Sequence, residues 1–175
     1  VAPLLGDADL YILPLQMAKG TSLLQQLQGA EYAAIQQLTI ETALRGKAVM
    51  CSGANLLVNR HRWLESYADL HPDLPSGDDM FLLESFKRRN LRIVVWDEPI
   101  ADAFIQPQPT MNLLFKQRMR WAGKAPHYVD RDIWLCGILV ALANLLQVLC
   151  PAVLLIKFPL EYTLIKKRDS RVSLW

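Results

Sequence analysis

The sequence predicts an α/β domain over residues 1–130, followed by a membrane-associated segment over residues 131–175. Two observations lead to this prediction. Helical patterns alternate with short β-rich runs before Lys124, which is typical of mixed α/β domains. After them comes Trp134–Ile156, a long apolar run without a charged residue. A chain of 175 residues is long enough to bury a core, so we expect a folded domain before the apolar run.

The composition argues against two classes of protein. The net charge is only +2, and the basic residues cluster beside the apolar run instead of alternating with aromatic residues. We therefore expect no nucleic-acid partner. The three cysteines, Cys51, Cys136 and Cys150, show neither CxxC nor Cys/His spacing. This pattern argues against a structural zinc site and against a disulfide framework.

The first half of the chain should contain a long helix between extended segments. Leu10–Leu15 is rich in β-forming residues. Ser22 is a good N-cap for a helix that runs to about Leu44. The turn Ser52–Asn55 should separate two short strands, Ala48–Cys51 and Leu56–Val58. The helix should bury one apolar face, which comprises Leu23, Leu24, Leu27, Ala30, Ala34 and Leu38.

In the second half, either Ser76 or Asp78 should cap a helix that runs to about Arg89. Basic residues in its last turn suit the helix dipole. The other elements that we expect are a helix over Arg60–Leu70, a loop over His71–Gly77, strands at Leu91–Trp96 and Ala103–Ile105, and a helix that Thr110 caps and that runs to about Lys124.

The apolar run Trp134–Ile156 would cover about 30 Å of hydrocarbon at ~1.5 Å per residue. A buried core helix is the alternative. Pro151 indicates a kink or a break into two shorter helices. Basic residues flank both ends, so a single span would leave one basic flank outside, against the positive-inside tendency. A helical hairpin or an interfacial segment would keep both flanks in the cytoplasm, and the sequence leaves these alternatives open.

Two carboxylates, Asp78 and Asp79, lie where a loop turns into a helix. Acidic residues favour helix N-termini, so capping alone explains them. The functional interpretation is a general base that accepts the proton of a hydroxyl group. The two interpretations are compatible, because one aspartate can cap the helix while the other faces a site.

On the helix after Thr110, Gln117, Arg120 and Trp121 lie at positions i, i+3 and i+4 and share one face, whereas Arg118 should point elsewhere. A planar guanidinium suits a diphosphate, because its fork can bind two oxygen atoms. An indole offers a platform for the apolar face of a sugar. The alternative is a basic amphipathic helix on anionic lipid, with Trp121 as its interfacial anchor.

Together, Gly77-Asp78-Asp79 and Gln117-x-x-Arg120-Trp121 resemble the motifs of the membrane-associated family-2 glycosyltransferases of the GT-A fold. These include cellulose, hyaluronan and chitin synthases. The resemblance covers about Ala8 to Lys157. It implies polysaccharide biosynthesis at the cell membrane, with the catalytic part facing the cytoplasm. The implied reaction is inverting transfer from a nucleotide-diphospho-sugar to a saccharide or lipid acceptor, with membrane lipid as a further partner.

The resemblance also implies roles for individual residues. Asp79 would be the catalytic base, with Asp78 beside it. Gln117 and Arg120 would bind the donor diphosphate, and Trp121 would line the acceptor site. The turn residues Gly53, Ala54 and Asn55 resemble the small-residue turn near the family's acceptor pocket, although a plain tight turn explains them equally well.

A divalent metal, Mg²⁺ or Mn²⁺, is the implied cofactor. Asp7-Ala8-Asp9 has the DxD form of the family's metal motif, and its oxygen ligands suit these ions. Alternatively, Asp9 begins a later strand of the fold. The metal would then be held mainly by residues outside this chain, the nucleotide-binding half would precede Val1, and the fragment would be inactive alone.

A non-catalytic membrane adaptor, docked on anionic lipid through its basic helix, is the rival function. An adaptor needs neither Asp79 nor Gln117, so these two residues distinguish the alternatives.

Overall fold

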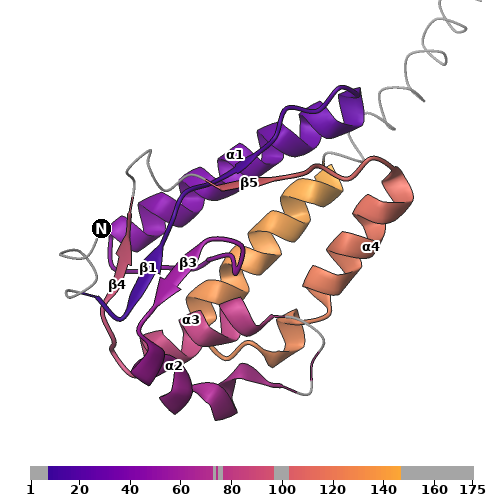
Figure 1. Ribbon diagram of the computed structural model, residues 1–175. Helices are drawn as coiled ribbons and strands as arrows, with labels where there is room; N and C mark the ends of the chain where they lie inside the picture. Colours follow the sequence, from indigo (N-terminus) through magenta and orange to yellow (C-terminus); the bar gives the residue numbers. More distant parts are fainter. Residues whose placement is uncertain (1–7, 73, 75–76, 97–102, 147–175) are drawn as a thin grey trace, which may run out of the picture. The chain divides into compact units, whose positions relative to one another are not determined.

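The computed structural model describes residues 8–72, 74, 77–96 and 103–146. The chain divides into two compact units, Val1–Trp134 and Leu135–Trp175. All of the named helices and strands lie in the first unit (Figure 1).

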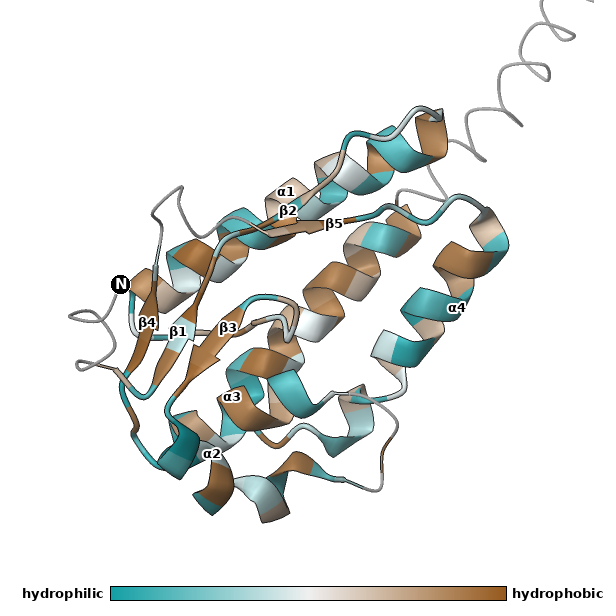
Figure 2. Ribbon diagram, viewed as in Figure 1, coloured by the Kyte–Doolittle hydropathy of each residue, from teal (hydrophilic) through white to brown (hydrophobic). Residues whose placement is uncertain are grey.

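Two small sheets form the extended part of the first unit. In the first, β1 (Leu10–Ile12) lies between β3 (Leu56–Val58), which is antiparallel to it, and β4 (Ile93–Val95), which is parallel. In the second, β2 (Leu15–Met17) runs parallel to β5 (Ala103–Ile105). Figure 2 shows that β1, β3 and β4 are largely apolar.

The extended run predicted at Leu10–Leu15 is therefore divided between the two sheets. Pro14 lies at the division, and it has no amide hydrogen to donate to a ladder. Its carbonyl oxygen instead accepts hydrogen bonds from the Asn55 side chain, at 2.6 Å, and from the Ala103 amide, at 3.4 Å. The proline thus marks the point at which the chain leaves one sheet and enters the other.

The helices predicted in the first unit are present, but the one predicted over Arg60–Leu70 is divided into an α-helix, Arg60–Glu65, and a 3-10 helix, Tyr67–Leu70. Ser22 caps the longest of them and forms a capping box with Gln25, Asn59 caps the second, and Thr110 caps the helix that begins at Met111. In chain order the helices are α1 (Leu23–Leu44), α2 (Arg60–Glu65), η2 (Tyr67–Leu70), α3 (Asp78–Arg88), α4 (Met111–Ala122) and η4 (Ala125–His127).

The predicted buried face of α1 is wrong. Leu23 is 72% exposed and Leu27 is 58% exposed. The buried residues lie on another face and include polar side chains that have local partners: the Thr39 hydroxyl donates to the Ile35 carbonyl at 2.9 Å. A polar residue can be buried once its hydrogen bonds are satisfied, so apolar spacing alone did not identify this face. The buried residues are Gln28, Tyr32, Ile35, Thr39 and Ala43.

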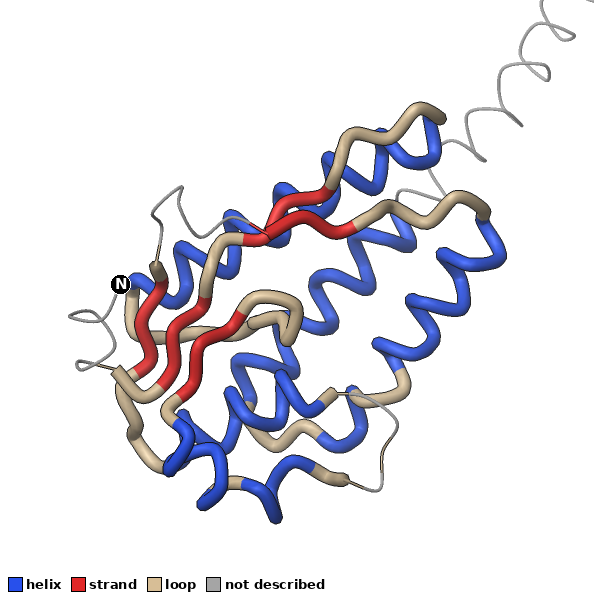
Figure 3. The backbone as a smooth tube through the Cα atoms, in the orientation of Figure 1, coloured by secondary structure: helices blue, strands red, loops and turns tan. Residues whose placement is uncertain are grey.

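The strand predicted at residues 48–51 is also absent from the described part of the chain. Ala48 and Val49 are buried, but residues 47–51 run as a loop (Figure 3). Both edges of β1 are already paired, one with β3 and the other with β4, so this segment has no place beside the middle strand. It packs through its side chains instead of through a ladder.

The N-cap of α3 is Gly77, not Ser76 or Asp78. Gly77 has a φ of 113°, in the left-handed region that favours glycine, and Asp78 is the first helical residue. Ser76 lies outside the described residues. The Lys124 side chain packs over Gly77: a Cβ atom added there would lie 2.7 Å from Lys124 Cδ.

Helix α3 supplies the centre of the core. Leu83 and Phe86 are fully buried, and they belong to one cluster with Leu10 and Ile12 of β1. The cluster also contains residues from α1, η2 and the segment after η4, so the first unit has one core that joins its sheet to its helices. Its buried members are Leu10, Ile12, Ala43, Ala48, Leu70, Leu82, Leu83, Phe86 and Ile133.

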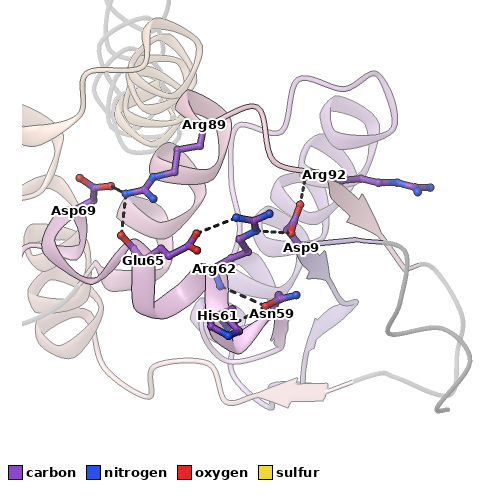
Figure 4. A network of polar contacts seen from close by, with 8 residues as sticks. All are labelled: Asp9, Asn59, His61, Arg62, Glu65, Asp69, Arg89 and Arg92. Atoms are coloured by element: carbon purple, nitrogen blue, oxygen red, sulfur yellow. Dashed lines mark hydrogen bonds and ion pairs between the residues drawn. The ribbon is translucent and has the colours of Figure 1, made fainter.

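A polar network ties the start of β1 to α2 and to the end of α3 (Figure 4). The Asp9 carboxylate accepts hydrogen bonds from Arg62 Nε, at 3.3 Å, and from the Arg92 amide, at 2.9 Å. Farther along, Asp69 binds Arg89 at 3.0 Å, and Arg89 also donates to the Glu65 carbonyl at 2.9 Å.

Residues 131–146 form a further helix. Asp130 caps it, because its Oδ1 atom accepts hydrogen bonds from the amides of Asp132 and Ile133. Residues 147–156 of the predicted apolar helix, including Pro151, lie outside the described residues. Among the described helices, none is both long and apolar enough to cross a bilayer. The membrane helix or hairpin over residues 131–175 therefore stays a prediction.

Gly77→Ala should destabilise the fold by about 1–2 kcal/mol, because alanine is strained at a φ of 113°. Gly29→Ala is the matched control: this helical glycine has nothing within 4 Å of an added Cβ atom. It should stabilise the fold by about 0.5–1 kcal/mol. Urea unfolding of both variants measures these changes. Equal stability of Gly77→Ala and the wild type would contradict the left-handed cap.

Asp69 should make stability depend on acid pH. The hydrogen bond from Ser85, at 2.6 Å, does most to hold the pKa of Asp69 below its usual value. Partial burial raises this pKa, whereas Arg89 and Arg88 lower it further. A carboxyl group with a lowered folded-state pKa stabilises the fold above its unfolded pKa of about 4, and this contribution is lost as the pH falls through the folded pKa.

The Tm difference between wild type and Asp69→Asn should accordingly be largest near neutral pH and should shrink below about pH 4. Ser85→Ala should weaken the same pH dependence, because it removes the main cause of the shift. Thermal unfolding between neutral pH and about pH 3 measures both effects. A Tm difference that stays constant over this range would show that Asp69 does not act through its charge.

Candidate functional site

The Asp79 side chain lies at the start of α3 and contacts the turn at residues 52–55. Its Oδ2 atom accepts a hydrogen bond from the Gly53 amide at 2.9 Å, and its Oδ1 atom accepts one from the Met80 amide at 2.8 Å. Asp79 is half-buried, whereas Asp78 is exposed. The fold thus brings together two parts of the predicted site that are 26 positions apart.

The last residue of the turn, Asn55, both anchors it and closes it. Asn55 donates through its amide group to the Pro14 carbonyl, between β1 and β2. The Asn55 backbone amide donates to the Ser52 carbonyl at 3.1 Å and closes the turn. Gly53 and Ala54 are exposed at its tip. A Cβ atom added at Gly53 would meet Asp79 at ordinary contact distances, so the turn contributes its backbone amide and does not require glycine for space.

Three groups in this region, Tyr32, Cys51 and Tyr128, are affected by the charge of Asp79. Burial raises the pKa of Tyr32 to about 12. Hydrogen bonds with Gln36 and Ser52 lower this pKa, whereas the Asp79 charge raises it. Burial, together with the Asp79 charge, also raises the pKa values of Cys51 and Tyr128. The Cys51 thiol donates to the Asp79 carbonyl oxygen at 3.2 Å. These three groups therefore stay protonated at neutral pH and do not compete with a carboxylate as bases.

The second motif lies on α4, and no side chain of this helix is fully buried. Gln117 is half-buried, Arg120 is exposed, and Trp121 is 36% exposed. The expectation that Arg118 points away from this group is wrong. Its guanidinium carbon lies 4.6 Å from the centroid of the Trp121 ring, and the same guanidinium forms an ion pair with Glu31 of α1.

The chain after α4 returns to the start of α3. Lys124 lies against Gly77. Aromatic side chains from the residues after Lys124 pack against α3 in the same region. Phe81 of α3 lies 5.6 Å from Tyr128 and 4.6 Å from His71, measured between ring centroids. The end of one motif helix is therefore adjacent to the start of the other. Because the two motifs would serve one transfer reaction, we predict that Asp79 and the face formed by Gln117, Arg120 and Trp121 line one common cleft.

Polar contacts farther along α3 hold this returning segment. The Glu84 carboxylate accepts hydrogen bonds from the backbone amides of Val129 and Asp130. Lys87 forms an ion pair with Asp130 at 2.8 Å. Helix α3 thus carries Asp79 at its start and fixes the segment that follows the second motif.

The residues of the possible metal motif are only partly described. Asp7 lies outside the described residues. Asp9 immediately precedes β1, and its two carboxylate oxygens bind Arg62 and the Arg92 amide. A guanidinium in this position repels a divalent cation, so Asp9 as placed here fits a structural role better than a ligand role. Within the described ranges, no group of three or more His, Cys, Asp or Glu side chains could hold a metal. The divalent metal stays a prediction.

Sequence reasoning missed several neighbours of the two motifs. Arg118 was visible inside its motif, but its partner Glu31 is 87 positions away and carries no local signal. Tyr32 and Cys51, beside Asp79, likewise belong to no recognisable pattern. The spatial surroundings of a motif depend on tertiary contacts, which spacing along the chain does not encode.

A protein-family model matches the part of the chain that carries both motifs. Residues 13–124, more than half of the chain, match the family model described as "Glycosyltransferase like family 2". The matched range contains Asp78, Asp79 and the segment Gln117–Trp121. No significant match was found among curated proteins or among solved structures. On the evidence of this match, the chain belongs to the family-2-like glycosyltransferases.

Proposed function

We propose that this chain is the acceptor-side part of an inverting glycosyltransferase in which Asp79 is the general base. Family membership supports glycosyl transfer in general. The observation that carries the proposal is the pair of backbone amides, from Gly53 and Met80, that orient the Asp79 carboxylate beside the turn. The donor would be a nucleotide-diphospho-sugar and the acceptor a saccharide or a lipid, at the cytoplasmic face of the cell membrane.

Asp79 is better suited than Asp78 to act as the base. Each oxygen of its carboxylate accepts one backbone hydrogen bond, and a carboxylate has about four lone-pair sites, so acceptor capacity remains. The two amide hydrogen bonds also fix the orientation of the carboxylate at the start of α3. Asp78 is more exposed and would add negative charge beside the base.

In the proposed reaction, the acceptor hydroxyl gives its proton to Asp79 while its oxygen attacks the anomeric carbon. The bond from that carbon to the diphosphate oxygen breaks, and the electron pair leaves with the nucleotide diphosphate. Attack from the opposite face inverts the anomeric configuration. Gln117 and Arg120 would bind the leaving diphosphate. A divalent metal, held mainly by residues outside this chain, would neutralise diphosphate charge.

The membrane setting is part of the proposal. Exposed leucines of the helix at residues 131–146 support it, with Leu139 64% and Leu146 58% exposed. On α4, Met111, Phe115 and Met119 are also exposed and recur every four residues, so they form one stripe. This stripe favours the second candidate, a membrane adaptor. The adaptor accounts for the stripe but gives no reason for the oriented carboxylate of Asp79.

In the full-length protein, Asp79→Asn should lower kcat by about 10²-fold or more, because it removes the base and changes little volume. The KM for the donor should stay nearly unchanged, since the donor contacts are elsewhere. Nucleoside diphosphate release measures both parameters. Asp132→Asn makes the same change at an exposed position of another helix start and should leave turnover unchanged. Equal losses of donor affinity and of turnover would indicate a structural role for Asp79.

A second experiment tests membrane association. The full chain should float with vesicles that contain anionic lipid. Leu139→Glu/Leu142→Glu should reduce the floated fraction severalfold, because a charge is costly in the apolar layer. Leu44→Glu, at a 68% exposed position of α1, is the matched control and should float like the wild type. Recovery of the wild-type chain in the vesicle-free fraction would contradict the membrane proposal and leave the transferase proposal intact.

A further inference from the structure

Helix α4 carries the second motif, and polar contacts with other elements hold it within the described structure. None of its side chains is fully buried within the described structure, so packing in the core does not hold it. Before its N-cap, Gln28 of α1 exchanges two hydrogen bonds with the backbone of Gln108, at 3.0 and 2.9 Å. After its end, Lys124 lies against Gly77. Between these two points, the ion pair of Arg118 with Glu31 joins α4 to α1.

This ion pair is partly shielded from solvent. The exposed fraction is 23% for the Arg118 side chain and 11% for the Glu31 side chain. Charges attract each other more strongly when they are partly buried, and the removal of one partner leaves the other charge uncompensated. Burial lowers the pKa of Arg118, and the Glu31 charge opposes that change. Arg118 therefore depends on Glu31 for its counter-charge.

The same guanidinium also contacts the indole of Trp121. Its central carbon lies 4.6 Å from the ring centroid, within the distance of about 6 Å at which a cation is attracted to an aromatic face. Arg118 is thus held at one side by a carboxylate of α1 and at the other by the indole three residues farther along α4. Trp121 remains 36% exposed, which leaves indole surface open to a ligand.

We propose that Arg118 is a positioning residue for Trp121 and that Glu31 holds it in place. Through this pair, α1 sets the orientation of the indole on which the acceptor sugar would stack. The inference rests on the proposed function for the identity of the acceptor, but the geometry itself involves only this chain. Arg118 itself need not touch the substrate.

Three variants separate the two contacts. Arg118→Met keeps much of the side-chain length and removes the charge from both contacts. Arg118→Lys keeps the charge for Glu31 but loses the planar group that stacks on the indole. Glu31→Gln keeps the indole contact possible but removes the counter-charge. Glu41→Gln is the matched control, because it breaks an exposed ion pair with Arg45 on the same helix.

The first measurement reports on Trp121 without a substrate. The emission of Trp121 is obtained as the difference between each protein and the same protein with Trp121→Phe. In Arg118→Met and Glu31→Gln this emission should move to longer wavelength, and acrylamide should quench it more strongly. The emission wavelength and the quenching of Arg118→Lys should lie between those of these two variants and those of the wild type. Glu41→Gln should match the wild type.

The second measurement is kinetic and uses the full-length enzyme. The donors are UDP-glucose, UDP-N-acetylglucosamine and GDP-mannose, and the soluble acceptors are cellotetraose and chitotetraose. Arg118→Met should raise the acceptor KM about 10-fold or more, because a displaced platform loses acceptor binding. The donor KM should change by less than about twofold. Arg118→Lys should restore part of the acceptor affinity.

The outcomes distinguish the two proposals. If Trp121 emission is the same in Arg118→Met and the wild type, the positioning role is wrong, whatever the activity. If the acceptor KM is unchanged while kcat and Tm fall together, Arg118 is merely structural. If the wild type transfers from none of the three donors, the proposed function loses its support, and the emission measurement alone decides whether Arg118 and Glu31 orient Trp121.

Discussion

The packing of α3 against β1 is the constraint on which the first unit depends. Leu83 and Phe86 are fully buried in one cluster with Leu10 and Ile12. A close-packed core leaves its elements little freedom, so the first turn of α3 is fixed relative to the sheet. Asp79 belongs to that turn, which is why its carboxylate can meet the backbone of a turn that is distant in sequence.

The two motif helices are held in different ways. Helix α3 is embedded in the core, whereas α4 is attached through polar contacts and through the segment that follows it. Under the proposed function, a half-buried base on a firmly held helix and a less tightly held binding helix would suit a transferase. A base acts only when it is well oriented, whereas groups that bind a donor and an acceptor must also admit and release them.

Local chemistry made much of the chain predictable. Ser22, Thr110 and the apolar spacing identified α1 and α4, since capping and periodicity act over a few residues. The motifs around Asp79 and Trp121 predicted the family that the match over residues 13–124 shows. In contrast, the cap of α3 depended on the backbone conformation of Gly77, which residue preferences for side-chain caps do not reveal.

The sequence by itself thus determined which helices form, which motifs they carry and which chemistry those motifs suggest. Only the tertiary structure decided which face of α1 is buried, because Gln28 finds a hydrogen-bond partner in the distant Gln108 that periodicity cannot anticipate. It also decided that Gly53 meets Asp79 and that Glu31 meets Arg118. Such pairs join residues far apart in the chain, and their contacts exist only once the core has brought their helices and turns together.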